Sequence, residues 1–524
     1  MKSCINCQSS FTIRPEDEVF YGRMDVPAPT HCPACRAQRR WAFRNQYNLY
    51  KRTCDFSGKE MLSLYSPDKP LKVYEESVWW SDAWDPLDYG RDYDFSRPFF
   101  DQYKELFWAV PRHAMHQDGT NENCDYITYG GGNKSCYLAF ACIYSEDIYF
   151  SSFLLFCKDS LDSTRCIESS LLYECVDCEK SYECFFCKDC ISCQDSLFLD
   201  DCRNCKNCIG CKNLRNKEYH IFNEPVSKEE FERVKAEILK DGGRSFKEKF
   251  DAWRLTQPYV YARINNSENC VGNYLENAHN SYHSFDLVMG ADDCNYCINA
   301  GWKGKDMWDC TMTGKEAELL YEMHATVNTQ HSAFCSFIRS CSDIYYCDSM
   351  DAAQNCFGSI GLRHKQYCIL NKQYSKEAYE ALLPRIIEHM KATGEWGEFP
   401  PIWLSPFAYN ETLANEHFPL TKEAALAKGY TWKDEAVTAV EGGCKSCGRA
   451  YKVIPQEKAF YGRMGLPEPE NCWKCRHERR FRSRNPYRLW KRNCHKCQKE
   501  IETSYSPERP EIVYCETCYL ADVY

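Results

Sequence analysis

Apolar positions in the middle of the chain recur at every third residue. Between Cys124 and Cys211 there are 15 cysteines, and all of them fall in one register modulo three. Sorted into rows of 18 residues, they stack in columns, and Leu154 shares a column with Cys136 and Cys190. Neutral thiols pack as small hydrophobes, so this register is typical of an interior column. The pattern predicts a cysteine-rich parallel β-solenoid, in which each coil buries its inner face against its neighbours.

A related pattern follows later in the chain. Glu122-Asn123-Cys124 matches Glu268-Asn269-Cys270 at an offset of 146 residues, and Leu214–Glu229 matches Leu362–Glu377 at an offset of 148. Each copy ends in a serine that can cap a helix, Ser227 in the first and Ser375 in the second. We therefore expect a mainly β fold whose solenoid has two related halves, each followed by a helix. The period-three cysteines of the second half are Cys335, Cys341, Cys347, Cys356 and Cys368.

The two ends of the chain are copies of each other at an offset of 440 residues. Both carry Cys-x-x-Cys pairs, and Phe20–Met24 matches Phe460–Met464. Zinc in structural sites prefers four Cys or His ligands in a closed tetrahedron, and a pair of such turns supplies them. Three complete sets of four predict three structural zinc ions. The expected ligands are Cys4, Cys7, Cys32 and Cys35; Cys444, Cys447, Cys472 and Cys475; and Cys494, Cys497, Cys515 and Cys518.

The N-terminal copy has lost its second site. Cys54 corresponds to Cys494, but the other three ligands are replaced by Ser57, Glu75 and Val78. One thiolate cannot complete a tetrahedral shell, so no fourth zinc ion is expected.

The terminal copies resemble a small bacterial and archaeal family described as a probable treble-clef zinc-binding domain. The resemblance rests on Cys444-Lys445-Ser446-Cys447-Gly448, Phe460-Tyr461 and Cys472-Trp473-Lys474-Cys475-Arg476, and it covers about residues 4–40 and 444–480. It implies zinc and a treble-clef fold, and it implies no reaction. Gln8 stands where the family pattern has glycine. The stretch from Ser375 to Phe407 also resembles large uncharacterised cysteine-rich bacterial proteins, some of which carry a CoA-transferase label that no motif in this chain supports.

Two other kinds of site were weighed for the middle of the chain. The runs Cys184–Cys193 and Cys202–Cys211 contain the C-x2-C-x2-C spacing of iron–sulfur proteins, but their fourth spacing departs from the ferredoxin pattern. A hexapeptide acyltransferase also uses 18-residue coils, yet its aliphatic-glycine signature is absent. Packing in a solenoid remains the preferred interpretation of these cysteines.

The repeats divide the chain into seven segments. We expect a treble-clef zinc module with a degenerate second site at 1–60, an aromatic connector and capping helix at 61–120, solenoid half 1 at 121–224, a helix at 225–262, solenoid half 2 at 263–372, a helix and Pro-containing connector at 373–443, and a two-site zinc module at 444–524.

Composition narrows the cellular setting. The chain has 524 residues and 37 cysteines, an odd number, with no apolar leader and no apolar run long enough for a membrane helix. In a reducing compartment, such thiols act as metal ligands or buried hydrophobes more often than as disulfides. We expect a cytoplasmic protein without a membrane partner.

Charge is distributed unevenly along the chain. Residues 1–60 carry a net charge of +4 and residues 444–524 carry +7, which leaves −21 for the middle. Basic residues with aromatic neighbours suit phosphate contacts and base stacking, so nucleic acid, RNA rather than DNA, is the expected partner of the ends. Docking against the acidic middle of the same chain is the alternative. The candidate contacts are Arg36, Arg39, Arg40, Arg476, Arg479, Arg480, Arg482, Arg484, Arg488, Lys491 and Arg492.

Taken together, these features favour a non-enzymatic, zinc-binding scaffold or adaptor whose basic ends bind nucleic acid without strong sequence specificity. The acidic solenoid could in addition present a face to a protein partner. The alternatives are a self-associating structural solenoid and, less favoured, a metal-cluster or acyltransferase-type enzyme.

Overall fold

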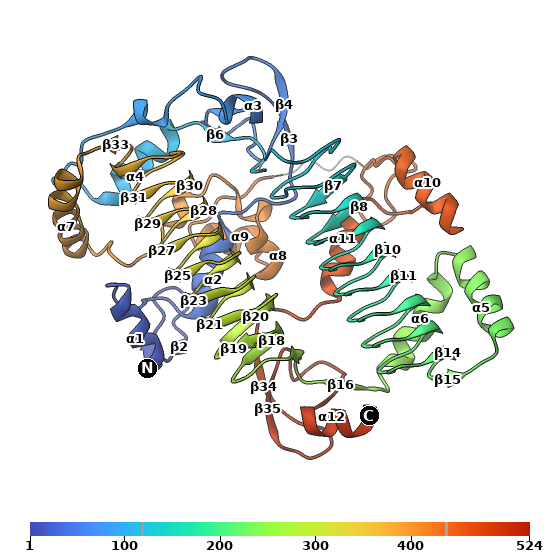
Figure 1. The fold of residues 1–524 in the computed structure, drawn as a ribbon. Helices are drawn as coiled ribbons and strands as arrows, with labels where there is room; N and C mark the ends of the chain where they lie inside the picture. Colours follow the sequence, from blue (N-terminus) through green and yellow to red (C-terminus); the bar gives the residue numbers. More distant parts are fainter. Residues whose placement is uncertain (118, 435–438) are drawn as a thin grey trace. The chain divides into compact units, whose positions relative to one another are not determined.

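The chain folds into two compact units, each of which combines one solenoid half with one terminal module (Figure 1). The computed structural model describes residues 1–117, 119–434 and 439–524, so residues 435–438 of the expected connector lie outside the described residues. Unit 1 comprises Met1–Ala114, Ala262–Lys433 and Tyr487–Leu489, and unit 2 comprises Met115–Tyr261, Asp434–Pro486 and Trp490–Tyr524. The N-terminal module therefore belongs with solenoid half 2, and the C-terminal module belongs with solenoid half 1.

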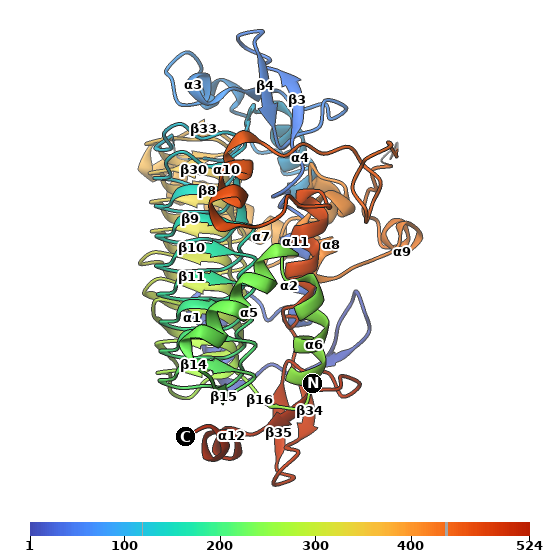
Figure 2. The ribbon, with the colours of Figure 1, turned by 90° about the vertical axis from the view of Figure 1, so that its right-hand side faces the viewer.

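Solenoid half 1 is a nine-stranded sheet whose strands follow one another in chain order. Its strands pair in parallel, except for the last pair, β14 and β15, which is antiparallel. The stacked rungs are visible from the side in Figure 2. The strands are β7 (Tyr137–Phe140), β8 (Glu146–Ser152), β9 (Lys158–Leu161), β10 (Ser170–Tyr173), β11 (Tyr182–Phe185), β12 (Gln194–Leu197), β13 (Lys206–Ile209), β14 (Glu218–Ile221) and β15 (Glu224–Pro225).

One coil of half 1 takes 12 residues, so the expected row length of 18 is wrong. Ser170 pairs with Tyr182, and Tyr182 pairs with Gln194 in the next coil. The backbone enters the left-handed region at every third residue, for example at Glu174 (φ 53°) and Asp177 (φ 53°), which turns the chain after each triplet. Because 12 and 18 are both multiples of three, the cysteine register could not distinguish the two periods.

The interior of these short coils is filled by small side chains that carry a polar hydrogen. Cys175 Sγ donates to the carbonyl oxygen of Cys184 at 3.0 Å, and Ser145 Oγ donates to that of Leu154 at 3.4 Å. The backbone N–H of Cys193 donates to Ser181 Oγ at 3.3 Å. Cysteine and serine thus serve the same purpose, since each fills a narrow interior and satisfies inward-facing backbone groups. The interior position predicted for the period-three cysteines is confirmed.

Solenoid half 2 is built in the same way but has two sheets, whose strands pair in parallel except for the last pair, β32 and β33. Its first coils take 11 or 12 residues, as between Ile264 and Leu275, the following coils take 13, as between Ala291 and Gly304, and the later coils take 12, as between Gln330 and Ser342. The first sheet contains β17 (Ile264–Asn265), β18 (Val271–Glu276), β20 (Tyr282–Val288), β22 (Ile298–Gly301), β24 (Thr311–Gly314), β26 (His324–Val327), β28 (Ser336–Arg339) and β30 (Asp348–Asp351). The second contains β19 (Ala278–His279), β21 (Ala291–Asn295), β23 (Gly304–Trp308), β25 (Glu318–Tyr321), β27 (Gln330–Ala333), β29 (Ser342–Tyr345), β31 (Gln354–Phe357), β32 (Gln366–Ile369) and β33 (Lys372–Gln373).

Helices follow each half, as expected. Ser227 Oγ caps α5 (Lys228–Lys240) and Ser375 Oγ caps α7 (Lys376–Thr393), while α6 (Arg244–Arg254) is an additional helix after half 1. Short helical segments also lie in the connectors. They are η1 (Pro86–Tyr89), η2 (Ile402–Leu404), η3 (Tyr409–Glu411), α8 (Leu413–His417) and α9 (Lys422–Ala427).

The helix expected within residues 61–120 is α4, which spans Phe99–Ala109. Its cap does not come from a neighbouring residue. The carboxylate of Glu395 accepts hydrogen bonds from the backbone N–H groups of Phe99 and Phe100 at 2.8 and 2.7 Å. A distant side chain therefore provides the cap, which local sequence could not reveal.

Across the ranges 1–117, 119–434 and 439–524, no helix is both long and apolar enough to cross a membrane.

Candidate metal centres

The two terminal modules share one order of elements from their first helix onward, and the N-terminal module begins with two additional short strands. In the N-terminal module these are β1 (Lys2–Ser3), β2 (Ser10–Phe11), α1 (Pro15–Arg23), α2 (Pro33–Trp41), β3 (Tyr50–Thr53), β4 (Glu60–Ser63), β5 (Val73–Tyr74) and α3 (Glu76–Trp79), with β5 paired to β6 (Arg112–His113). In the C-terminal module they are α10 (Pro455–Met464), α11 (Trp473–Arg482), β34 (Trp490–Asn493), β35 (Glu500–Thr503), β36 (Ile512–Tyr514) and α12 (Glu516–Val523), with β36 paired to β16 (Pro258–Val260).

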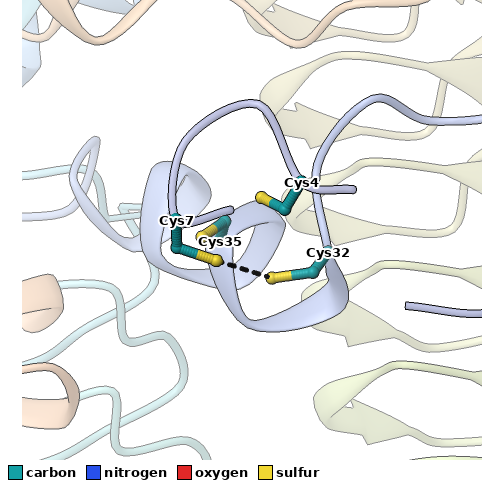
Figure 3. A group of neighbouring side chains, drawn as sticks. All are labelled: Cys4, Cys7, Cys32 and Cys35. Carbon is teal, nitrogen blue, oxygen red and sulfur yellow. Dashed lines mark hydrogen bonds between the residues drawn. The ribbon is translucent and has the colours of Figure 1, made fainter. Parts of the chain in front are cut away.

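The first four predicted ligands converge in the N-terminal module. Cys4 and Cys7 come from the turn between β1 and β2, and Cys32 and Cys35 lie at the start of α2 (Figure 3). All four sulfur atoms lie within 4.8 Å of one another, and Cys7 Sγ and Cys32 Sγ are 3.7 Å apart. This cluster is positioned to hold a metal ion.

The C-terminal module assembles two such clusters. Cys447 Sγ and Cys472 Sγ are 3.7 Å apart in the first, and Cys497 Sγ and Cys515 Sγ are 3.7 Å apart in the second. In each cluster, the four sulfur atoms lie within 4.8 Å of one another. The structure therefore brings together all twelve predicted ligands, in the three predicted groups: Cys444, Cys447, Cys472 and Cys475; Cys494, Cys497, Cys515 and Cys518; and the N-terminal four.

Each ligand turn places a residue in the left-handed region directly after its second cysteine position. Gly448 has φ 73° there, whereas Gln8 has φ 61° and Gln498 has φ 62°. The turn therefore forms at Gln8 despite the lack of glycine, at some cost in backbone strain.

Backbone N–H groups favour the thiolate form of the first cysteine of each tetrad, Cys4, Cys444 and Cys494. Burial would raise the pKa of Cys494, but N–H groups of Cys497, Cys515 and Lys496 outweigh burial and lower the pKa to about 6. The pKa of Cys444 is also lowered to about 6, by backbone N–H groups of Cys472, Cys447 and Ser446 that outweigh its burial. Thiolates are the form that binds metal, so the turns are electrostatically suited to ligation.

Burial dominates at some of the solenoid thiols. Burial raises the pKa of Cys142 and of Cys341 to about 12, and both donate to or lie beside backbone carbonyl groups. Within the described part of the chain, the three terminal tetrads are the only groups of three or more metal-binding side chains that come together. The runs Cys184–Cys193 and Cys202–Cys211 do not contribute such a group among the described residues.

The predicted nucleic-acid contacts of the N-terminal module lie against solenoid half 2. Arg36 Nε is 2.8 Å from Asp309, and Arg40 is 2.8 Å from a carboxylate oxygen of Glu322. Arg39 pairs with the same Glu322 at 2.9 Å. All three arginines are buried, so their guanidinium groups face carboxylates of the solenoid rather than solvent.

The C-terminal module repeats this arrangement on solenoid half 1. Arg476 Nε is 2.8 Å from Asp162, and Arg480 is 2.9 Å from the same carboxylate. Arg479 pairs with Glu174 at 2.5 Å with half of its side chain exposed. Arg484 is buried and lies 2.7 Å from Asp177.

The other predicted contacts are less enclosed. Arg482 is 79% exposed and Lys491 is 70% exposed, the latter 3.0 Å from Glu500. Arg488 is exposed, and Arg492 is half-buried, donating to the carbonyl oxygens of Ser506 and Glu511.

The acidic partners of these arginines are functional residues that no local motif identifies. Asp162 and Asp309 are 147 residues apart, and Glu174 and Glu322 are 148 apart, close to the offset of the solenoid repeat. These carboxylates recur at the offset of the solenoid repeat, and the arginines recur at the 440-residue offset of the terminal modules. The two repeats together are the signal that could have identified the surfaces where each module contacts its solenoid half.

The fold and these sites define a cysteine-rich β-solenoid protein with three Cys4 metal-binding sites in two terminal modules. No family model and no curated protein matches the chain, so the resemblance to treble-clef domains rests on residues and geometry alone. Among solved structures, the chain is similar to a candidate acetyltransferase from Desulfovibrio desulfuricans G20, with 10% identity and a TM-score of 0.11. The match covers 44% of this chain and 63% of that protein, and so low a score supports no argument about fold or activity.

Proposed function

We propose that the protein is a non-enzymatic, zinc-binding scaffold in which each terminal module stabilises the acidic side of one solenoid half. The observation that supports this proposal is the repetition of one contact in both units: Arg36 with Asp309, and Arg476 with Asp162, each at 2.8 Å. A buried guanidinium–carboxylate pair of this kind fixes orientation, because either partner left alone would be costly.

Zinc is the metal that suits the tetrads best. Four thiolates in a closed shell are the donor set of structural zinc sites, which leave no open position for substrate. When bound, the ion would cross-link the Cys-x-x-Cys turn to the start of the arginine-bearing helix, α2 or α11. Metal binding would thereby be coupled to the docking of that helix on the solenoid.

Metal analysis combined with hydrogen exchange tests this proposal. Purified protein should contain three zinc ions per chain. Stripping the metal with a strong chelator should increase exchange in α2 and α11 and also in the solenoid strands β9 and β23, which Asp162 and Asp309 directly follow. Unchanged exchange in those strands after complete zinc loss would refute the scaffold role of the modules.

Nucleic-acid binding is a second candidate, with RNA favoured over DNA. It is supported by the cations that stay exposed in the C-terminal module, such as Arg482 and Lys491. Titration of full-length protein with single-stranded RNA at about 50 mM salt tests it, and affinity should fall steeply with added salt. The variant Arg482→Glu with Lys491→Glu should weaken binding, while an Arg39→Gln variant should affect stability instead. Absence of RNA binding at low salt would refute nucleic-acid binding, and the scaffold role would remain as the proposed function.

A further inference from the structure

A cleft of about 120 Å³ lies in unit 2, where α6 and the C-terminal end of α11 approach solenoid half 1. Its apolar wall includes Val176, Phe198 and Phe250, and Phe198 stacks on Phe186 with ring centroids 4.6 Å apart. Charged side chains, among them Lys188, complete the lining. The cleft thus combines an aromatic surface with a cation, as ligand sites often do.

The corresponding place in unit 1 is filled. The residue equivalent to Val176 is His324, which is fully buried and packs against Trp41 at a centroid distance of 6.1 Å. Trp41 itself is completely buried. Its counterpart in the C-terminal module is the smaller Phe481, which does not line the cleft. The two units therefore differ at equivalent places: the side chain of Trp41 fills the space in unit 1, and the space is open in unit 2.

The carboxylates of the cleft are already neutralised by arginines or lysines. Glu174 pairs with Arg479 at 2.5 Å, and Asp200 pairs with Lys212 and Arg254, each at 3.2 Å. These groups contribute no net negative potential that would repel an anion from the cleft.

Lys188 is a cation of the lining with hydrogen-bonding capacity to spare. Its ammonium group donates to the carbonyl oxygen of Ser483 at 2.6 Å, while the nearer oxygen of Asp189 is 3.9 Å away, beyond hydrogen-bond distance. An ammonium group has three donors, so one contact leaves others for a ligand. Burial lowers the pKa of Lys188, and an anion in the cleft would offset that effect by pairing with it.

We propose that this cleft binds a small carboxylate with an apolar ring, whose ring lies on the aromatic wall and whose carboxylate faces Lys188. The size is suitable, because an apolar cavity on the order of 150 Å³ accommodates a benzene-sized molecule. A neutral ring would use only the wall, and a small inorganic anion would use only the lysine.

Benzoate is the probe for the test. Calorimetric or NMR titration of the full-length, zinc-loaded protein should show saturable binding of benzoate, with benzamide binding about tenfold more weakly because it lacks the charge. Equal affinity for benzoate and benzamide, or no saturation by benzoate, would overturn the proposal.

Two variants locate the site. Lys188→Gln should weaken benzoate binding about tenfold, whereas the matched control Lys206→Gln, at an exposed lysine of β13, should leave it unchanged. The double variant Val176→His with Phe481→Trp copies the residues of unit 1 and should abolish binding by filling the space. Unaltered affinity in either the Lys188 variant or the double variant, with the melting temperature retained, would show that the cleft is not the site.

Discussion

The second metal site of the C-terminal module and its counterpart in the N-terminal module show one fold stabilised in two ways. In the C-terminal module, the β34–β35 hairpin carries Cys494 and Cys497, which meet Cys515 and Cys518. In the N-terminal module, the β3–β4 hairpin keeps only Cys54 of that set. Both hairpins pair their strands in the same register, so the loss of three ligands did not change the local structure.

Aromatic packing takes the place of the metal in the N-terminal copy. Tyr74 packs against Phe56 and Trp84 with ring centroids 5.4 and 5.5 Å apart, and Trp79 lies 4.8 Å from Trp84. Cys54 Sγ still accepts the backbone N–H of Glu75 at 3.4 Å, as Cys494 Sγ accepts that of Cys515 at 3.2 Å. The comparison indicates that buried aromatic area can supply the free energy that a structural metal supplies in the other copy.

The largest expected effect separates these two sites directly. Cys515→Ser should release one zinc ion and unfold the hairpin and α12, because apparent zinc binding contributes on the order of 10 kcal/mol to such modules. Cys54→Ser should retain all three ions and lower the melting temperature only slightly. Metal analysis and limited proteolysis of both variants give the answer. Equal loss of metal from the two would mean that the N-terminal hairpin also binds an ion.

Local sequence predicted the metal ligands well because a Cys-x-x-Cys turn is a short-range feature. Spacing within a few residues fixes which sulfur atoms can meet, and all twelve ligands were identified in their groups. The coil length was not predictable in the same way. A triplet register fixes which residues face inward. The number of triplets in one coil depends on how often the backbone turns, and this number cannot be deduced from any single residue of the sequence.

The docked arginines illustrate a longer-range limit. Sequence showed that Arg476 and Arg480 share a helix face and carry charge, which suits either a phosphate or a carboxylate. The choice depends on Asp162, more than 300 residues earlier in the chain, and only folding brings the two together.

The next effect concerns these buried ion pairs, because the equivalent arginines of the two units have different numbers of carboxylate partners. Arg36 pairs with Asp309, whereas Arg476 is shared between Asp162 and Glu457, both at 2.8 Å. Asp309→Asn should therefore cost about 3 to 5 kcal/mol, because it leaves a buried guanidinium without its carboxylate. Asp162→Asn should cost about 1 to 3 kcal/mol, since Glu457 remains. Chemical unfolding at pH 7.5 measures both, and a larger loss for Asp162→Asn would contradict this account.

A smaller effect distinguishes the interiors of the two solenoid halves. Cys175 in half 1 corresponds to Met323 in half 2, and both are fully buried. Met323→Ala should cost about 2 to 4 kcal/mol and Cys175→Ala about 1 to 2 kcal/mol, in proportion to the cavity left. Cys175→Ser should cost less than Cys175→Ala, because the serine at the equivalent position one coil earlier, Ser163, already donates to an inner carbonyl group, that of Leu161. Thermal unfolding of the three variants checks this order, and it fails if serine proves the more costly replacement.

The smallest expected effect is a difference in pH dependence between the modules. Burial raises the pKa of Glu457 to about 7, although Arg476 lies close by. Burial would also raise the pKa of Asp17, its counterpart, but hydrogen bonds from Arg14 and Trp308 hold that pKa below its usual value. Between pH 6 and pH 8, Glu457 loses its proton in the folded state but is already ionised in the unfolded state. Stability should therefore fall as pH rises, by about 1 kcal/mol from this group.

Glu457→Gln should remove that slope, and Asp17→Asn provides the matched control. Asp17 is ionised in both folded and unfolded states across this range, so its stabilising contribution would be lost only at much lower pH. The free energy of unfolding of wild type and both variants, measured at pH 6 and pH 8 with saturating zinc, gives the comparison. The free energy of unfolding should change with pH through Glu457 and not through Asp17. This account would be disproved if Glu457→Gln kept the pH dependence of the wild type, or if Asp17→Asn removed it.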